Sequence, residues 1–338
     1  MRGVVFVGNR QVEIQEFPDP VPGPGEVVVK MRASGICGSD LNRYRVAEPS
    51  VGVTGHEPCG EVAALGPGVT GATVGDRVVI YHYVGCGICE YCRTGWEHLC
   101  QTSARKTYGV AANGGNADYI LVAARTLVPL PEELSYEEGA ALACGTGTAY
   151  GALLRLDVSG RDTLAVFGQG PVGLSATLLA KAMGARVIAV DVSPTRLEFA
   201  REMGADHVID SREVDPVAEI QQLTHGKGAD ATMDCTGNAD ARAQMIRSAR
   251  IWGRACFVGE RGTVTLNPTP DIIHKLLTIY GSWTFSVTIL AQCMRFVVDR
   301  RVPLDRLITR RYALDQAAQA FSEFEAGSVG KSVFVMPD

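Results

Sequence analysis

Four cysteines lie close together in one glycine-containing loop, where they could share a metal ion. Cys86, Cys89, Cys92 and Cys100 form a C-x2-C-x2-C-x7-C pattern. Four thiolates at such short spacings can surround Zn²⁺ tetrahedrally at about 2.3 Å per bond. An iron–sulfur cluster uses similar ligands, but the sequence suggests no redox partner for one. Because protein would fill every coordination position, we predict a structural zinc that folds its own loop.

A second group of residues could form an open metal site. It consists of Cys37, the neighbours His56 and Glu57, and Cys144. Two thiolates and an imidazole would leave one position of zinc for water or an alcohol. Spacing alone does not establish this site, because the residues are far apart in sequence and a lone cysteine is more often a small buried hydrophobe.

A glycine-rich turn predicts a nucleotide site. Residues 168–173 read GQGPVG, a G-x-G-x-x-G motif that follows a predicted strand and opens a helix with Pro171 and Val172. Gly168 would make the tight turn, Gly170 would admit the pyrophosphate, and Gly173 would let helix and strand pack closely. A turn of this kind also arises for structural reasons alone, so the motif needs support from a second residue.

Asp191 gives that support, since it ends the next predicted strand 23 positions after Gly168. A carboxylate there can bind both hydroxyls of the adenosine ribose and would repel a 2′-phosphate, which favours NAD over NADP. Arg196 weakens this preference, because it could meet a phosphate. Arg196 could also be a solvated residue of the first helical turn, or pack against the adenine.

The elements that must position these residues change in character along the chain. Before about residue 135, short strands separated by Pro/Gly turns are predicted at 4–7, 12–16, 26–30, 60–64, 77–81 and 119–123. After about residue 162, strands predicted at 163–167, 186–190, 207–209, 231–234 and 254–258 alternate with helices. This alternation predicts a doubly wound parallel sheet in Rossmann order. Beyond Pro303 we expect edge elements that rejoin the first domain, not another βαβ unit.

Composition limits the classes of function. The chain has 338 residues, which suggests about two domains, and its net charge of −5 makes nucleic acid an improbable partner. Ten cysteines without a recognisable secretory signal favour reduced thiols and a cytoplasmic location over a disulfide framework. No apolar run reaches the roughly 18 residues of a membrane span, so we expect no membrane partner.

Together these motifs resemble the zinc-dependent medium-chain dehydrogenase/reductase family, which includes alcohol, sorbitol and threonine dehydrogenases. The resemblance covers nearly the whole chain. It implies an α/β protein with a GroES-like, β-rich catalytic domain over residues 1–150, completed by about 291–338. A Rossmann NAD-binding domain would span residues 151–290, and the active site would lie in the cleft.

The resemblance also implies roles for single residues. Cys37, His56 and Cys144 would hold the catalytic zinc, with Glu57 as an occasional extra ligand and Asp40 holding the His56 ring. In this family zinc acts as a Lewis acid on the alcohol, and hydride passes from carbon to the nicotinamide. Ser39 matches the hydroxyl that accepts the alcohol proton.

Two residues depart from the family pattern. Asn42 stands where many relatives carry the histidine that ends the proton relay, and Asn cannot titrate. Cys144 stands where sorbitol and threonine dehydrogenases resemble one another in having Glu, which disfavours a true threonine dehydrogenase. Arg43, Tyr44 and Glu57 are polar candidates near the metal, and they slightly favour a polyol or a sugar-derived alcohol over a long apolar one.

We therefore expect a zinc-dependent oxidoreductase that transfers hydride between a secondary alcohol or polyol and NAD. It would bind two Zn²⁺ per chain and form a homodimer or homotetramer, as relatives do. Three other possibilities stay open: a non-catalytic NAD-binding protein, a dehydrogenase for a β-hydroxy amino acid such as threonine, and a zinc-free quinone reductase. The last would lack both sets of metal ligands.

Overall fold

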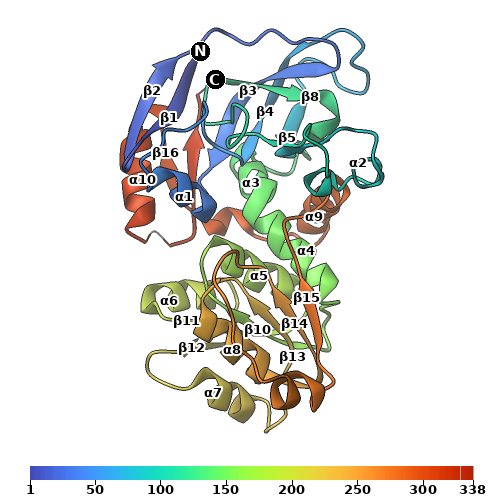
Figure 1. Cartoon of the computed structure of the whole chain (residues 1–338), viewed down its shortest axis with the longest axis vertical. Coiled ribbons are helices and arrows are strands. Elements are labelled where there is room, and N and C mark those ends of the chain that lie inside the picture. Colours follow the sequence, from blue (N-terminus) through green and yellow to red (C-terminus); the bar gives the residue numbers. More distant parts are fainter. Residues whose placement is uncertain (328, 338) are drawn as a thin grey trace. The chain divides into compact units, whose positions relative to one another are not determined.

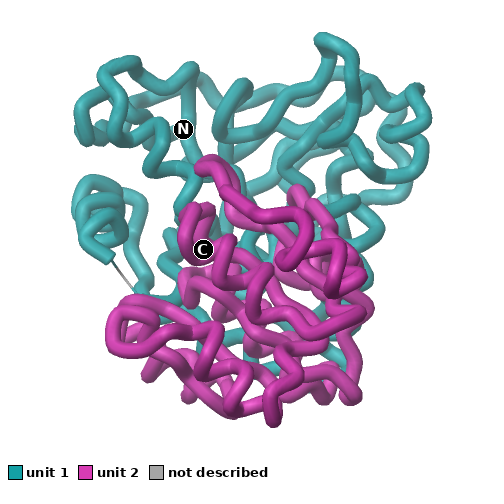
Figure 2. Tube along the Cα trace, turned by 60° about the horizontal axis from the view of Figure 1, so that its bottom comes forward, with its two compact units in different colours: residues 1–147, 285–338 teal, residues 148–284 magenta. Residues whose placement is uncertain are grey.

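The chain divides into two units in the computed structural model, which describes residues 1–327 and 329–337. One unit comprises Met1–Gly147 with Phe285–Asp338, and the other comprises Thr148–Thr284 (Figure 2). The segment 291–338 that was expected to complete the first domain includes residues 328 and 338, which lie outside the described residues.

A seven-stranded sheet organises the first unit, in the order β16–β17–β3–β4–β5–β9, with β8 also paired to β3 (Figure 1). Its strands are β3 (Glu26–Gly35), β4 (Pro58–Leu65), β5 (Arg77–Ile80), β8 (Tyr119–Ala123), β9 (Leu127–Pro129), β16 (Ile308–Tyr312) and β17 (Lys331–Val335). Two small sheets join β1 (Arg2–Gly8) to β2 (Gln11–Glu16) and β6 (Tyr83–Val84) to β7 (Lys106–Thr107).

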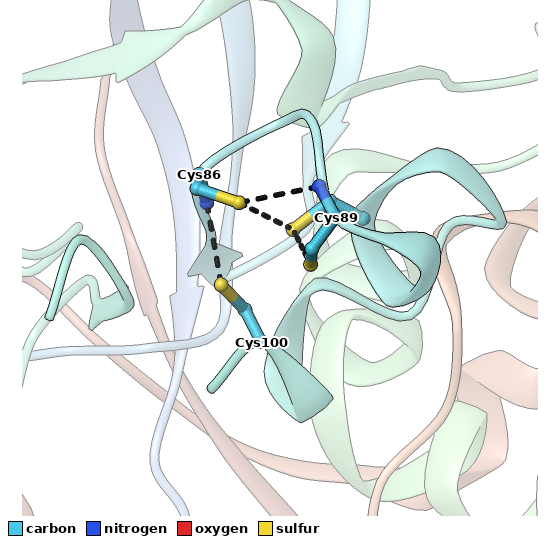
Figure 3. A group of neighbouring side chains, drawn as sticks. Cys86, Cys89 and Cys100 are labelled. Atoms are coloured by element: carbon cyan, nitrogen blue, oxygen red, sulfur yellow. Dashed lines mark hydrogen bonds between the residues drawn. The ribbon is translucent and has the colours of Figure 1, made fainter. Parts of the chain in front are cut away.

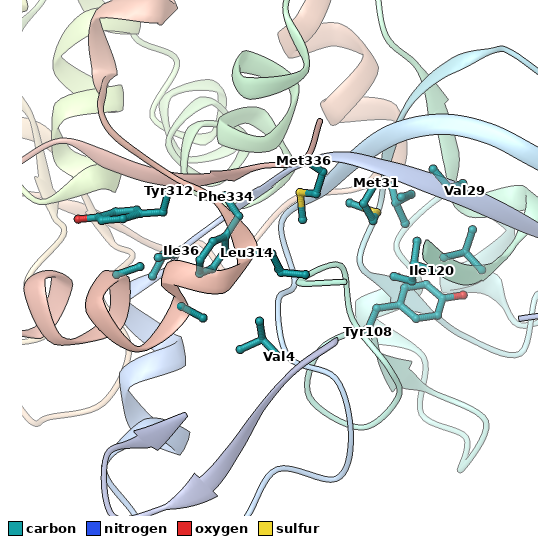
Figure 4. Packing of buried hydrophobic residues seen from close by; sticks show 14 of the residues in the cluster. Val4, Val29, Met31, Ile36, Tyr108, Ile120, Tyr312, Leu314, Phe334 and Met336 are labelled. Atoms are coloured by element: carbon teal, nitrogen blue, oxygen red, sulfur yellow. The ribbon is translucent and has the colours of Figure 1, made fainter. Parts of the chain in front are cut away.

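Helices and short helical turns of this unit lie between its strands. They are η1 (Gly38–Asp40), α1 (Leu41–Tyr44), α2 (Glu90–Arg93), η2 (Glu97–Leu99), η3 (Ala124–Thr126), α3 (Tyr136–Ala141), η4 (Leu142–Thr146), α9 (Val287–Asp299), η6 (Leu304–Leu307), η7 (Leu314–Gln316) and α10 (Ala317–Glu325). Apolar residues from β1, β3, β8 and the tail form a shared core, part of which Figure 4 shows.

The expectation of mere edge elements in the tail is wrong. Strand β16 pairs in parallel with β17, and α10 makes the crossover between them, so this segment is a βαβ unit. Helix α10 buries Ala320, Phe321 and Phe324 at helical spacing, and Phe321 meets Phe6 edge-on at 4.8 Å between ring centroids. The buried helical face explains the crossover. Strand β17 then pairs antiparallel with β3, so of the two tail strands only β16 is an edge strand of the sheet.

The second unit is a doubly wound sheet in the order β12–β11–β10–β13–β14–β15, and its neighbouring strands pair in parallel. Its strands are β10 (Thr163–Phe167), β11 (Arg186–Asp191), β12 (His207–Asp210), β13 (Ala229–Asp234), β14 (Ala249–Phe257) and β15 (Thr278–Gly281). Its helices are α4 (Gly147–Arg155), α5 (Pro171–Ala182), α6 (Pro194–Glu202), α7 (Pro216–Leu223), α8 (Ala239–Ser248) and η5 (Thr269–Ile273). In chain order the strands lie 3-2-1-4-5-6, so the predicted Rossmann order and the α/β fold class are confirmed.

Within the described residues, no helix is both long enough and apolar enough to cross a bilayer.

Candidate functional site

The four cysteines of the predicted structural site converge in the first unit. Their sulfur atoms all lie within 4.8 Å of one another, and Figure 3 shows Cys86, Cys89 and Cys100 around the common centre. The Sγ atoms of Cys89 and Cys92 are 3.4 Å apart, and those of Cys86 and Cys92 are 3.9 Å apart. A ZnS₄ tetrahedron with bonds of about 2.3 Å has edges of about 3.8 Å, so the donor set fits zinc.

Backbone amides donate hydrogen bonds to two of the four sulfurs of this site. The amides of Cys89 and Cys86 donate to the sulfurs of Cys86 and Cys100, each at 3.4 Å. Backbone hydrogen bonds lower the pKa of Cys86, and hydrogen bonds from Thr102 lower the pKa of Cys100 to about 6. Burial instead raises the pKa of Cys92 to about 12. Metal binding must therefore displace at least the Cys92 proton, which makes affinity depend on pH.

The open set of ligands also converges, although its members come from three distant segments. One donor atom each of Cys37, His56, Glu57 and Cys144 lies within 4.8 Å of the others. Cys37 follows β3 and caps η1, and His56 precedes β4. Cys144 lies in the π-helical turn η4, a geometry found often at functional sites. Two thiolates and an imidazole suit zinc with one open position.

Gly55 fixes the backbone conformation next to His56. Its φ of +93° is left-handed, and an added Cβ would lie 2.3 Å from Oδ1 of the buried Asn116. A side chain at this position would therefore strain the backbone and displace Asn116. The tight approach of these two residues fixes the backbone from which His56 projects.

Asp40 connects the first two ligands. One carboxylate oxygen accepts the backbone amide of Cys37 at 2.9 Å, and the other lies 2.9 Å from Nδ1 of His56. With the proton on Nδ1, facing this carboxylate, Nε2 would be left for a metal. The Ser39 hydroxyl lies 3.4 Å from Nε2, so Ser39 also faces the ligand set.

The pKa values of these ligands depend on one another. Burial alone would lower the pKa of His56, but the Asp40 carboxylate and Cys37 raise it well above its usual range. A hydrogen bond from Cys144 lowers the pKa of Cys37, and the same bond raises the pKa of Cys144. Zinc binding at these atoms would therefore have to displace protons, which makes the metal affinity depend on pH.

Two residues beside this set were not predicted from sequence. Lys331, from β17, forms a fully buried ion pair with Glu57, and its Nζ donates to the Ile36 carbonyl at 3.0 Å. His82 lies with its ring centroid 5.3 Å from that of His56, and its Nδ1 bonds the Ala143 carbonyl at 3.0 Å. Burial lowers the pKa of His82 to about 3, so this side chain stays neutral.

The glycine-rich turn of the second unit has the expected geometry. Gly168 has φ +90°, and Gly170 caps α5, whose first residue is Pro171. A Cβ on Gly173 would lie 1.8 Å from the Gly168 carbonyl oxygen, whereas a Cβ on Gly170 would meet nothing within 4 Å. Gly173 is thus required for packing, and Gly170 leaves open space beside the helix terminus, where anions bind. Val172 continues the first turn of α5.

Asp191 is fixed to this turn. Its carboxylate accepts the backbone amides of Gln169 at 2.5 Å and Ser193 at 2.9 Å. Arg196 lies in α6, and its backbone amide bonds the Ser193 hydroxyl at 3.4 Å. Gln169 was not recognised from sequence. Its buried side chain bonds the Val166 carbonyl and the Thr177 hydroxyl and so supports the turn from inside.

Family models match most of the chain. Residues 23–132 match the alcohol dehydrogenase GroES-like domain, and residues 171–299 match the zinc-binding dehydrogenase domain.

Curated relatives match over nearly their whole length. An uncharacterised zinc-type alcohol dehydrogenase-like protein of Escherichia coli, YphC, is 40% identical over 100% of this chain and 99% of its own. The L-threonine 3-dehydrogenase of Pyrococcus horikoshii is 36% identical, covering 96% and 95%. The sorbitol dehydrogenase of Bacillus subtilis is 35% identical, covering 95% and 92%.

Solved structures share the fold. The alcohol dehydrogenase TADH from Thermus sp. ATN1 superposes with a TM-score of 0.92 at 29% identity over 100% of both chains. An alcohol dehydrogenase of E. coli CFT073 in complex with NADH gives 0.88 at 28% identity over 99% of each chain. A zinc-binding dehydrogenase of Sinorhizobium meliloti bound to NADP gives 0.90 at 27% identity over 99% of each chain.

Proposed function

Because this chain belongs to the zinc-dependent alcohol dehydrogenase family and is a zinc-dependent oxidoreductase of alcohols or polyols with a nicotinamide cofactor, we propose which residues carry the reaction. Cys37, His56 and Cys144 hold the catalytic zinc. The observation that carries this proposal is the convergence of their donor atoms within 4.8 Å, with Asp40 on the far nitrogen of His56.

Each side chain has a defined task in this proposal. When bound, zinc supplies a Lewis acid that lowers the pKa of an alcohol hydroxyl, and the nicotinamide supplies the hydride acceptor. Asp40 keeps the Nε2 of His56 directed at the metal. Ser39, whose hydroxyl is 3.4 Å from that Nε2, accepts the alcohol proton. Glu57 is an occasional extra ligand that otherwise pairs with Lys331.

Asn42 lies in α1, three positions after Ser39, and cannot take a proton onward. The proton that Ser39 accepts would therefore leave without a titrating side chain at this position. An Asn42→His variant tests this part of the proposal, because a new imidazole in the proton path should alter the pH dependence of turnover. An unchanged profile would show that the position takes no part.

We propose that the second unit binds NAD in preference to NADP. The glycine turn of residues 168–173 binds the pyrophosphate, and Asp191 binds the adenosine ribose. The backbone bonds from Gln169 and Ser193 hold the carboxylate in place, so it would oppose a 2′-phosphate. Arg196, in the neighbouring helix, would moderate this preference.

We propose two zinc ions per chain, the second on Cys86, Cys89, Cys92 and Cys100. All ten cysteines of the chain are free thiols, and the sulfur spacing around this loop suits a closed ZnS₄ site. A cytosolic location, where thiols stay reduced, is consistent with this use of cysteine.

The exposed edge of the second unit supports self-association, as a homodimer or homotetramer. Strand β15 is the last strand of its sheet, and the apolar Ile279 and Trp283 on and beside it are 37% and 41% exposed. An edge strand with apolar side chains favours pairing with another chain. Light scattering of the purified protein, compared with an Ile279→Lys variant, tests this proposal, and a monomeric wild type would contradict it.

The central experiment measures reduction of NAD and NADP by the purified protein. Substrates are primary and secondary alcohols, polyols and L-threonine, the last because of the threonine dehydrogenase relative. We expect a secondary alcohol or polyol to reduce NAD, and a Cys144→Ala variant to lose this activity. Cys293→Ala is the matched control, since that buried thiol lies in α9 and outside both ligand sets. Equal activity of Cys144→Ala and Cys293→Ala would refute the ligand assignment.

A further inference from the structure

A charged pair, Glu97 within the four-cysteine loop and Arg125 outside it, hydrogen-bonds the residue that precedes the first ligand of the loop. The backbone amide of Gly85 donates to Oε2 of Glu97 at 2.5 Å, and the Gly85 carbonyl accepts from Nη2 of Arg125 at 2.6 Å. Nε of Arg125 bonds the other carboxylate oxygen of Glu97 at 3.0 Å. The three residues form a closed ring of hydrogen bonds that binds both polar backbone groups of Gly85.

Gly85 is in direct contact with the ligand sulfurs. A Cβ built on it would lie 2.5 Å from Sγ of Cys92 and 2.9 Å from Cβ of Cys100. Glu97 begins η2, which leads into Cys100, whereas Gly85 precedes Cys86. The Glu97 carboxylate therefore joins the two ends of the cysteine loop.

Arg125 connects this loop to the rest of the first unit. It lies in η3, directly after β8, and β8 pairs with β3 in the main sheet. The position of a Cβ on Gly87 would be 3.5 Å from Nε of Arg125, so the guanidinium lies against the loop on both sides of Cys86. Without Arg125, the loop would lose these contacts with the sheet-connected segment.

The pair is neutral overall, so it adds no net charge beside the proposed tetrathiolate site. The Glu97 side chain is only 6% exposed, and Arg125 is its ion-pair partner. Removing Arg125 would leave a buried carboxylate with the single amide of Gly85.

We infer that Glu97 and Arg125 are positioning residues that preform the four-cysteine loop and slow the release of its zinc. This inference rests on the proposed zinc at Cys86, Cys89, Cys92 and Cys100. Groups beside metal ligands typically change metal affinity by roughly 10–100-fold when they are removed. The pair bonds both backbone groups of Gly85, which precedes Cys86, and Glu97 begins the turn η2 that leads into Cys100.

The test measures zinc release from the full-length, zinc-loaded protein to a colorimetric chelator. Two release phases are expected, and a Cys144→Ala variant identifies the phase that belongs to the open site. Arg125→Met should accelerate the other phase by roughly tenfold or more and leave the open-site phase unchanged. Arg125→Lys keeps the positive charge but not the paired N–H donors of the guanidinium, so its zinc release should be faster than in the wild type and slower than in Arg125→Met. Glu97→Gln, which keeps one acceptor oxygen, should give an intermediate rate.

Arg93→Met is the matched control, because Arg93 lies in α2 within the same loop and its exposed side chain makes no ion pair among the described residues. Its release rates should equal those of the wild type. Wild-type release from Arg125→Met, or equal acceleration by Arg93→Met, would overturn the inference. Protein that holds no zinc on the four cysteines would overturn the proposed structural site as well, and total zinc per chain distinguishes this result.

Discussion

Replacement of Asp40 tests the proposed catalytic zinc site most directly. The Asp40 carboxylate accepts from the Cys37 amide and holds Nδ1 of His56, each at 2.9 Å, so one side chain orients two proposed ligands. Asp40→Asn keeps one acceptor oxygen, but its NH₂ group cannot accept a hydrogen bond. One of the two contacts must therefore be lost, and Asp40→Ala loses both.

The expected magnitude follows from the general effect of a carboxylate behind a ligating histidine. Loss of a carboxylate behind a ligating histidine typically weakens metal affinity by 10–100-fold. We therefore expect roughly tenfold weaker zinc binding in Asp40→Asn and up to about 100-fold in Asp40→Ala, or about 1.4 and 2.7 kcal/mol.

These losses should grow with pH. Asp40 also raises the pKa of His56, so in the wild type zinc must displace a proton from the imidazole. Without the carboxylate this competition weakens at low pH, which partly offsets the lost orientation. At a pH above the pKa of His56 no such offset remains, and the full loss of affinity appears.

Chelator competition over a pH series measures these affinities, with recovery of turnover by added zinc as a second readout. Asp76→Asn is the matched control. The Asp76 carboxylate accepts a hydrogen bond from the backbone amide of Thr73, three positions earlier, just as Asp40 accepts one from the amide of Cys37. The control should bind zinc like the wild type. Wild-type affinity in folded Asp40→Ala would refute the assigned role, and a loss that shrinks as pH rises would refute the proton competition.

Three further predictions concern the other sites. Gly173→Ala forces a Cβ to within 1.8 Å of the Gly168 carbonyl oxygen. It should lower the free energy of unfolding by about 1–3 kcal/mol and with it the melting temperature. Gly170→Ala has open space for its Cβ, so it should keep the wild-type melting temperature while raising KM for NAD. Asp191→Asn removes the charge that opposes a 2′-phosphate, so initial rates should show the NADP-to-NAD ratio of kcat/KM rising by roughly tenfold; an unchanged ratio would exclude this role. Cys89→Ser should reduce bound zinc by about one ion per chain, as metal analysis would show, and should lower thermal stability because the loop loses its metal.

Local patterns in the sequence predicted much of the fold. The strands from Thr163 to Phe257 are short apolar runs, because both faces of a parallel sheet are buried, and their alternation with helices specifies the Rossmann order. The glycine turn and the four-cysteine loop are equally local, so spacing alone describes them. The tail was misread because the buried spacing of Phe321 and Phe324 within a nine-residue helix is a weak signal beside the strand pattern.

Residues that act across long distances in sequence could not be predicted in this way. Lys331 reaches Glu57 only because β17 inserts beside β3, a pairing that no local pattern specifies. His82 has no motif around it, yet β5 delivers it to the ring of His56. Arg125 likewise has no motif around it, and its partners Gly85 and Glu97 lie in a different loop. Each of these contacts depends on the order of strands in the sheet.

The buried pair of Lys331 and Glu57 bears on whether the open zinc site stays open. The two thiolates of Cys37 and Cys144 would neutralise Zn²⁺, and Lys331 neutralises Glu57, so Asp40 would carry the one uncompensated charge of this region with Glu57 off the metal. If Glu57 left Lys331 in order to ligate the metal, Lys331 would lose its partner at a buried position. Breaking a buried ion pair typically costs about 3–5 kcal/mol. We therefore expect the pairing to hold Glu57 off the proposed zinc and to leave the fourth position for the alcohol.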